Sequence, residues 1–259
     1  MTQPNDSIVE WYDIARQEHV SQKGMNFGIN PEYSIILMSR RDNAPYNDRI
    51  YPDGITVEYE GHDIPKDTNK EHDQKAYTTS GTLTENGKFI KAVETYKQTG
   101  IPEKVKVYEK IIPNRWSLKG MFDLVDYKVV NDGKRNVFRF ILKLSNDASI
   151  LPGQTTDTKT LPHTRLIPSS VKQEVYIRDQ GKCVLCGSTE NLHFDHDLPF
   201  SKGGTSLSAD NIRILCQKCN LKKSDKIEWP LHSSLALPQD QSKNISQVIQ
   251  CLINTHAII

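Results

Sequence analysis

The amino-acid sequence predicts an α+β protein made of two parts. The first is a twisted β-sheet or half-barrel with packed helices, and the second is a smaller C-terminal domain of short strands and helices. Strand-like patterns dominate the first part, whereas four cysteines in two Cys-x-x-Cys pairs mark the second. Between them lies a Pro-, Ser- and Thr-rich stretch without hydrophobic period. We therefore divide the chain into residues 1–145, a linker at 146–169 and residues 170–259.

Strands are predicted along the first part by apolar and alternating runs. "YSIILMS" (33–39) is a short apolar run, and "GITVEYEG" (54–61) and "EKVKVYEKI" (103–111) alternate. "GMFDLVDYKVV" and "NVFRFILKLS" flank "NDGK", a turn signal typical of a hairpin. One helix is expected at "GKFIKAVETYKQTG", which ends at Gly100.

Composition and charge limit the classes of protein that fit. Hydrophobic residues make up 36% and charged residues 25%, as in ordinary globular proteins. The chain has no apolar run of membrane-spanning length and no secretory signal pattern at its start, so we expect a cytoplasmic protein without a membrane partner. The net charge is +1, so any nucleic-acid binding must depend on locally concentrated positive charge.

The cysteines indicate a metal site. In a reducing cytosol, paired cysteines indicate metal ligation or burial and not disulfides. Two Cys-x-x-Cys turns can together form a closed tetrahedral site of four thiolates, which suits structural Zn²⁺. Reduced core cysteines and an iron–sulfur cluster are the alternatives. The four predicted ligands are Cys183, Cys186, Cys216 and Cys219, and the fifth cysteine, Cys251, is expected to be buried in a C-terminal helix.

The segment between the cysteine pairs contains a recognisable order of residues. It has the form D-H-x-x-P, then G-G, then N-I-x-x-L-C-x-x-C-N, from Asp195 to Asn220. Its pattern predicts a strand, a loop, a second strand and a helix. This order resembles the HNH endonuclease family, with its ββα-metal fold, over residues 170–226. The resemblance implies metal-dependent hydrolysis of DNA phosphodiester bonds.

The resemblance also implies a role for each site residue. His196 would be the general base, Asp195 and Asn220 would bind a catalytic Mg²⁺ or Mn²⁺, and Asn211 would brace the loop and orient the histidine. Oxygen ligands and a base that titrates near neutrality suit this chemistry. Neighbouring residues of a regular strand point to opposite faces, so a bend or strand end is expected here. His193 is the competing candidate for the base.

Basic residues gather around the second cysteine pair. We expect them to contact DNA phosphates, which would supply the local positive charge that the whole-chain balance hides. A solvated helix face is the alternative for any one of them. The residues are Arg213, Lys218, Lys222 and Lys223.

The first part resembles a second family. Residues 22–145, through "YSIILMSRRDNAPYNDRIYPDGITVEYEGHD" and "DQKAYTTSGTLTENGKFIKAV", are similar to the SRA (YDG) domain, which binds modified cytosine by base flipping. The resemblance implies that Tyr46 and Tyr59 stack on the base and that Asp48 accepts from its amino group. Met38 and Ser39 would wall the pocket near the modified edge.

Some of these positions stay open because the segment from Ser39 to Tyr59 is longer than its counterpart in the family. Asp42 or Asp53 could replace Asp48, and Tyr51 could replace Tyr46.

Together the two resemblances predict a modification-dependent restriction endonuclease. It would flip modified cytosine, 5-methylcytosine foremost, in double-stranded DNA and cut nearby. The alternatives are a nuclease for another mark (5-hydroxymethylcytosine, glucosylated cytosine or phosphorothioate DNA) and a non-catalytic, zinc-stabilised DNA-binding protein. The tail "NISQVIQCLINTHAII" has an apolar helical face that either a homodimer or its own domain could cover.

Overall fold

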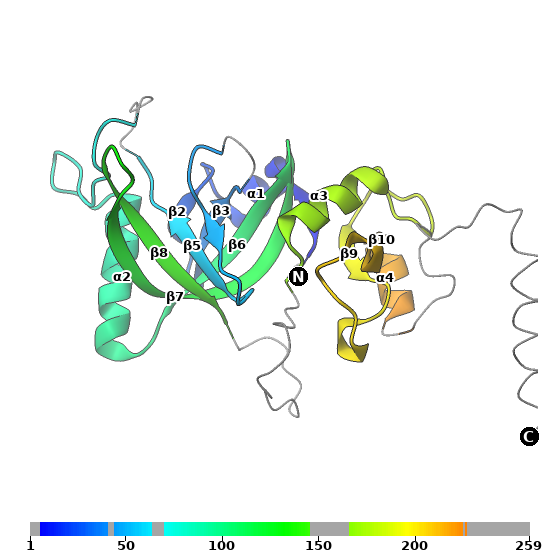
Figure 1. The fold of residues 1–259 in the computed structure, drawn as a ribbon. Coiled ribbons are helices and arrows are strands. Elements are labelled where there is room, and N and C mark those ends of the chain that lie inside the picture. Colours follow the sequence, from blue (N-terminus) through cyan, green and yellow to red (C-terminus); the bar gives the residue numbers. More distant parts are fainter. Residues whose placement is uncertain (1–5, 41–43, 64–69, 146–165, 225, 227–259) are drawn as a thin grey trace, which may run out of the picture.

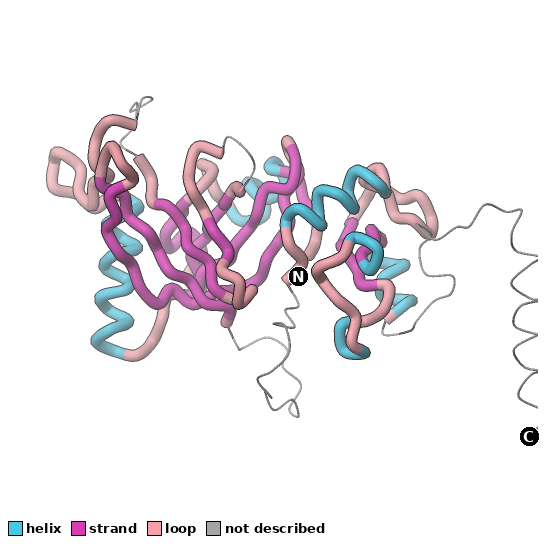
Figure 2. Tube along the Cα trace, viewed as in Figure 1, coloured by secondary structure: helices cyan, strands magenta, loops and turns pink. Residues whose placement is uncertain are grey.

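The computed structural model describes residues 6–40, 44–63, 70–145, 166–224 and 226. Figure 1 shows a large sheet with helices at its side, and a small unit of short strands and helices beside it. Figure 2 shows the same division, with strands concentrated in the larger part. The predicted α+β class is confirmed. Within the described residues, no helix has the length and apolar character needed to span a membrane.

An open, mixed sheet forms the first part. Its order is β2-β3-β6-β7-β8-β5-β4, and β1 pairs with β7. Strands β3 and β6 run parallel, whereas the other pairs are antiparallel. The strands are β1 (Ile8–Glu10), β2 (Met25–Asn30), β3 (Tyr33–Met38), β4 (Arg49–Ile50), β5 (Thr56–Glu60), β6 (Glu103–Ile112), β7 (Arg115–Asn131) and β8 (Asn136–Leu144).

Strand β3 is almost entirely apolar because both of its faces are covered. Ile36 and Met38 belong to the core that includes Phe89 of helix α2 (Glu85–Thr99). Ile35 belongs to a second core, which includes Ile14 of helix α1 (Trp11–Glu18). A strand buried on both faces loses its polar alternation, which explains why "YSIILM" is a continuous apolar run.

The predicted helix and hairpin are both confirmed. Helix α2 starts two residues before the predicted segment, where the Thr84 hydroxyl accepts a hydrogen bond from Gly87 N, and it ends at Gly100 with φ 74°. Such an N-cap and a left-handed glycine are the usual end signals of a helix. The β7–β8 turn closes with a hydrogen bond of 2.9 Å from Asp132 N to Arg135 O.

The C-terminal part follows the predicted order of strand, loop, strand and helix. Its elements are α3 (Ser169–Arg178), β9 (Leu192–His196), β10 (Ile212–Cys216) and α4 (Gln217–Lys223), with short 3-10 turns at Phe200–Lys202 and Ala209–Asn211. A separate core containing Val175, Phe194 and Ile214 holds them together. The expected C-terminal helix and residues 146–165 of the predicted linker lie outside the described residues.

The two parts share a packed boundary. Ile111 of β6 is buried in the C-terminal core together with Ile167 and Val171. The backbones of Ser7 and His193 also pair in an antiparallel bridge. Residues 166–169, the end of the predicted linker, therefore already belong to this boundary.

A buried carboxylate lies at the centre of that boundary. Glu109 is 1% exposed and pairs with Arg40 at 2.9 Å and with Lys119 at 2.7 Å. Burial raises the pKa of Glu109, but Lys119 and Arg40 outweigh it and the pKa is lowered. The Ser169 hydroxyl donates to Glu109, and Lys119 donates to Ile167 O at 3.2 Å. The start of α3 is therefore fixed to the sheet by hydrogen bonds to charged groups.

We expect Glu109→Ala to lower the free energy of unfolding by about 3–5 kcal/mol, because it leaves the buried Lys119 and the partly buried Arg40 without their counter-charge. Chemical denaturation measures this. Asp126→Ala is the matched control, since the Asp126–Lys97 pair is more than half exposed on both sides and should contribute little. Equal losses in the two variants would contradict a central role for Glu109.

Candidate functional site

The four predicted cysteines meet at one point. Their sulfur atoms all lie within 4.8 Å of one another. Cys186 Sγ and Cys216 Sγ are 3.6 Å apart, close to the ~3.8 Å expected for thiolates around a tetrahedral zinc with Zn–S bonds of about 2.3 Å. The set therefore fits a single zinc ion with no open coordination position.

The cysteine turns are tied to the small sheet by the backbone. Gly187 N donates to Cys183 O at 2.8 Å and closes the first turn, and Val184 N donates to Ile214 O at 3.0 Å. Cys216 ends β10 and Cys219 lies in the first turn of α4. A metal at this point would thus fix the angle between β10 and α4.

Strands β9 and β10 bring the predicted catalytic residues to one end of the small sheet. His196 is the last residue of β9 and pairs with Ile212, while Asp195 pairs with Arg213. The Asp195 carboxylate accepts from Lys223 Nζ at 2.6 Å, on α4. His196 Nε2 lies 2.9 Å from Ser206 Oγ, on the loop between the strands. The strand end predicted here is present, although the two side chains contact different elements.

Asn211 forms hydrogen bonds across this loop. Its Oδ1 accepts from Leu198 N at 2.8 Å, and its Nδ2 donates to Leu198 O and to Thr205 O. Because Ser206 follows Thr205 directly, Asn211 holds the segment that contacts His196. At Gly204 a Cβ atom would lie 1.8 Å from Leu198 O, so the loop requires glycine there.

The carboxylate of Asp195 forms an ion pair with the ammonium group of Lys223. The Lys223 ammonium contacts both Asp195 Oδ2 and the carbonyl oxygen of His196. Burial raises the pKa of Asp195, while Lys223 opposes the shift. Asn220 precedes Lys223 by three residues on α4, so the two share a helix face. Oxygen donors from Asp195 and Asn220 fit a hard divalent ion.

The structure divides the predicted phosphate contacts into two groups. Lys218 and Lys222 are exposed on α4. Arg213 and Lys223 are instead buried, because Arg213 pairs with Asp197 at 2.6 Å and Lys223 pairs with Asp195. The sequence shows their charge but not their burial, since the acidic partners come from the end of β9 and the residue after it.

His193 occupies a different environment from His196. It is 5% exposed, and burial lowers its pKa. Its backbone pairs with Ser7 at the boundary between the two parts. His193 and Asp195 lie on one face of the strand, but His193 is buried at the boundary, whereas His196 lies at the strand end beside Ser206.

A second site lies on the large sheet, where a cavity of about 400 Å³ opens beside the ends of β3 and β5. Asp48, a predicted base contact, lines it and is buried. One Asp48 oxygen accepts from Ser39 N and the other from Glu60 N, each at 3.0 Å, which joins the two strand ends. Burial raises the pKa of Asp48 to about 7, against the effect of these two N–H donors.

The two predicted tyrosines lie in different environments. Tyr46 lines the cavity, stacks against His62 at 6.2 Å and has Lys70 Nζ 4.2 Å from its ring centroid. Tyr59 and Met38 are 1% and 0% exposed and belong to the core under α2. The structure therefore brings Tyr46 and Asp48 together at the cavity, and leaves Tyr59 and Met38 outside its lining.

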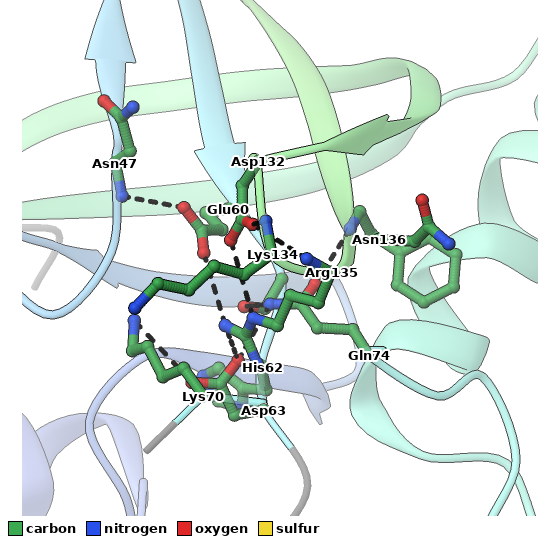
Figure 3. A network of polar contacts seen from close by, with 12 residues as sticks. Asn47, Glu60, His62, Asp63, Lys70, Gln74, Asp132, Lys134, Arg135 and Asn136 are labelled. Carbon is green, nitrogen blue, oxygen red and sulfur yellow. Dashed lines mark hydrogen bonds and ion pairs between the residues drawn. The ribbon is translucent and has the colours of Figure 1, made fainter. Parts of the chain in front are cut away.

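Charged residues that the sequence analysis did not single out complete this cavity. Glu60 accepts from Asn47 N at 2.8 Å and pairs with Arg139 at 3.1 Å. Figure 3 shows the adjoining network, in which Arg135 reaches the Asp63 carboxylate at 2.5 Å. The sequence indicates these residues only by charged residues at strand positions that are buried, such as Glu60 in "VEYEG".

Comparison with known proteins identifies the C-terminal part. Residues 183–226 match the family described as HNH endonuclease. The predicted HNH endonuclease domain is thus confirmed, and with it a nuclease. The comparison with curated proteins found no match.

The chain is also similar to several solved structures. One is the SUVH5 SRA domain with hemimethylated CG DNA, at 18% identity and a TM-score of 0.41, covering 60% of this chain and 92% of that one. The phosphorothioation-dependent restriction endonuclease ScoMcrA has 16% identity and a TM-score of 0.40, with 86% and 52% covered. The modification-dependent restriction endonuclease TagI has 15% identity and a TM-score of 0.38, with 84% and 76% covered.

We expect purified protein to contain one zinc ion per chain by elemental analysis. Mild EDTA should leave the fold intact, because a closed four-thiolate site releases its metal slowly, and Cys219→Ser should lower both zinc content and melting temperature. Iron in place of zinc, or an intact fold without metal, would contradict the assignment.

Proposed function

We propose that the chain is a modification-dependent DNA endonuclease: the cavity on the large sheet takes a flipped modified cytosine, and the HNH domain cuts the DNA nearby. The observation that carries the proposal is the site at the end of β9, where Asp195 and His196 lie between α4 and a loop braced by Asn211. The partner is double-stranded DNA carrying modified cytosine.

The cutting step needs a base, a Lewis acid and charge stabilisation. His196 takes the proton from the attacking water, and the contact to Ser206 fixes the orientation of its ring. Asp195 and Asn220 would hold Mg²⁺ or Mn²⁺, and such an ion would supply a Lewis acid for the phosphate and the leaving oxygen. Lys223 Nζ donates to one oxygen of Asp195 and partly neutralises its charge.

Asp48 and Tyr46 are the strongest candidates for holding the base. Each Asp48 oxygen accepts one backbone N–H and has a second lone pair for the cytosine amino group. Tyr46 offers a ring face once Lys70 moves aside. Tyr59 would have to leave the core before it could stack on a base.

The exposed lysines Lys218 and Lys222 contact phosphates next to the cutting site. One HNH domain cuts one strand, so a double-strand break requires two protomers or two successive visits. In a homodimer, the second protomer would supply the HNH domain that cuts the other strand.

Cleavage of matched plasmids tests the proposal. We expect metal-dependent cleavage of DNA that carries modified cytosine and little cleavage of the same sequence without it. A chain that cuts both plasmids at the same rate, or neither with any of the marks, would overturn the proposal.

His196→Ala should reduce the cleavage rate by about 10²–10⁴-fold, the usual contribution of general acid–base catalysis. DNA affinity should change little, because the base acts in the chemical step and not in docking. His72→Ala, at an exposed histidine on the large domain, is the control. A parallel loss of binding in His196→Ala would speak against the role of general base.

Tyr46→Ala should weaken binding of modified DNA by about 1–3 kcal/mol, the contribution of one base–aromatic stack. Binding of unmodified DNA should change much less, since phosphate contacts carry it. Tyr46→Phe keeps the ring and should behave like the wild type. If Tyr46→Ala weakens both DNAs equally, the residue contacts the backbone and not the base.

A further inference from the structure

We propose that Lys223 is a positioning residue of the nuclease site: it orients Asp195 and His196 together, and it is not one of the lysines that contact DNA phosphates. The inference rests on the proposed function, in which Asp195 and His196 act in the cutting step. Three observations support it: the burial of the Lys223 ammonium, the two groups to which it donates, and the place of Lys223 on α4.

The Lys223 side chain is enclosed by the protein. It is 1% exposed, whereas its neighbour Lys222 is exposed on the same helix. A contact with phosphate needs an ammonium that DNA can approach, so these two adjacent lysines of α4 have different roles. Because burying an unpaired ammonium is strongly unfavourable, the contacts of Lys223 with the protein hold it inside.

The first group that accepts from Lys223 is the carboxylate of Asp195. Lys223 Nζ donates to Asp195 Oδ2 at 2.6 Å. Arg213 Nε lies 3.8 Å from the same oxygen and pairs with Asp197 at 2.6 Å. Because 3.8 Å exceeds hydrogen-bond distance, Lys223 is the one of these two cations that holds the Asp195 carboxylate directly.

The second group that accepts from Lys223 is the carbonyl oxygen of His196. That carbonyl and the N–H of Asp197 belong to one planar peptide unit, and Asp197 N donates to Asn211 O at 2.8 Å. The peptide that follows His196 is thus held at both of its polar groups. Its orientation fixes the backbone of His196 at the end of β9, and with it the direction of the ring toward Ser206.

Lys223 also connects the two elements that carry the proposed metal ligands. Asp195 lies on β9 and Asn220 lies on α4. Lys223 follows Asn220 by three residues, so the two side chains lie on one face of the helix. The contact between Lys223 and Asp195 therefore limits how far β9 and α4 can move apart, and with them the two oxygen ligands.

Lys223→Met in the full chain tests the proposal, because it keeps the length of the side chain and removes its charge and its donors. We expect the cleavage rate at saturating modified DNA to fall about 10²-fold, the effect of displacing a catalytic group by about 1 Å. The affinity for the same duplex, measured without catalytic metal, should change by less than about twofold, because exposed phosphate contacts carry it.

Lys222→Met is the matched comparison on the same helix. It should weaken DNA binding and reduce the slope of log affinity against log salt by about one, as expected for one lost phosphate contact. Lys91→Met, at an exposed lysine of α2, should change neither the affinity nor the cleavage rate. If Lys223→Met loses affinity as Lys222→Met does, or cuts at the wild-type rate, the proposal is overturned.

Lys223→Arg is the second variant, for the case that Lys223→Met does not fold. It keeps the charge and the donors but changes the geometry of the head group, and the two residues are not interchangeable where geometry matters. It should cut about three- to tenfold more slowly than the wild type, because the catalytic groups are displaced less than in Lys223→Met, and its DNA affinity should be unchanged. A wild-type cleavage rate or a loss of affinity in Lys223→Arg overturns the proposal.

A measurement without metal or DNA separates this inference from the proposed function. In the DNA-free chain, the NMR resonances of the His196 ring should shift in either Lys223 variant, because the contact to the His196 carbonyl is lost or altered. The resonances of the exposed His72 should stay in place. Unchanged His196 resonances overturn the inference and leave the proposed function standing. A wild-type chain that cuts no modified DNA overturns the proposed function, whatever the resonances show.

Discussion

The buried carboxylate of Glu109 connects the two halves of the proposed mechanism. Glu109 forms an ion pair with Arg40, which follows β3 and lines the cavity. It also accepts a hydrogen bond from Ser169, which begins α3 of the C-terminal part. Lys119 completes the cluster from β7. Because a buried charge tolerates little displacement of its partners, the nuclease domain has a defined position relative to the cavity. Under the proposed function, the distance between the cut and the modified base therefore depends on this cluster.

The nuclease site itself is built from local constraints. The cysteine cluster fixes α4 to β10, and Asn211 fixes the loop beside His196. In the described structure, Lys223 neutralises Asp195, which lowers the electrostatic cost of keeping a half-buried carboxylate ready for a metal. A bound zinc would therefore add to the separate core of this small unit in holding Asp195 and His196 in place.

Sequence predicts the parts of this protein whose contacts are close in the chain. The cysteine pairs, the Asp195-His196 strand end and the bracing by Asn211 all lie within one short segment, and α2 was located by its terminal Gly100. The base cavity was predicted less completely. Glu60 and Arg139 come from different strands and meet only in the sheet, so a single run of sequence gives no sign of their pairing. Burial of Lys223 escaped prediction for the same reason, as did the position of Tyr59 in the core.

We propose above that the large sheet binds the modified base and that the HNH domain cleaves the DNA. A crystal structure of His196→Ala bound to a modified duplex tests it most directly. We expect the modified base outside the helix, stacked on Tyr46 with its amino group at Asp48, and a backbone phosphate beside Asp195 and Asn220. A modified base that stays stacked in the duplex, with the cavity facing away from the DNA, would contradict the account.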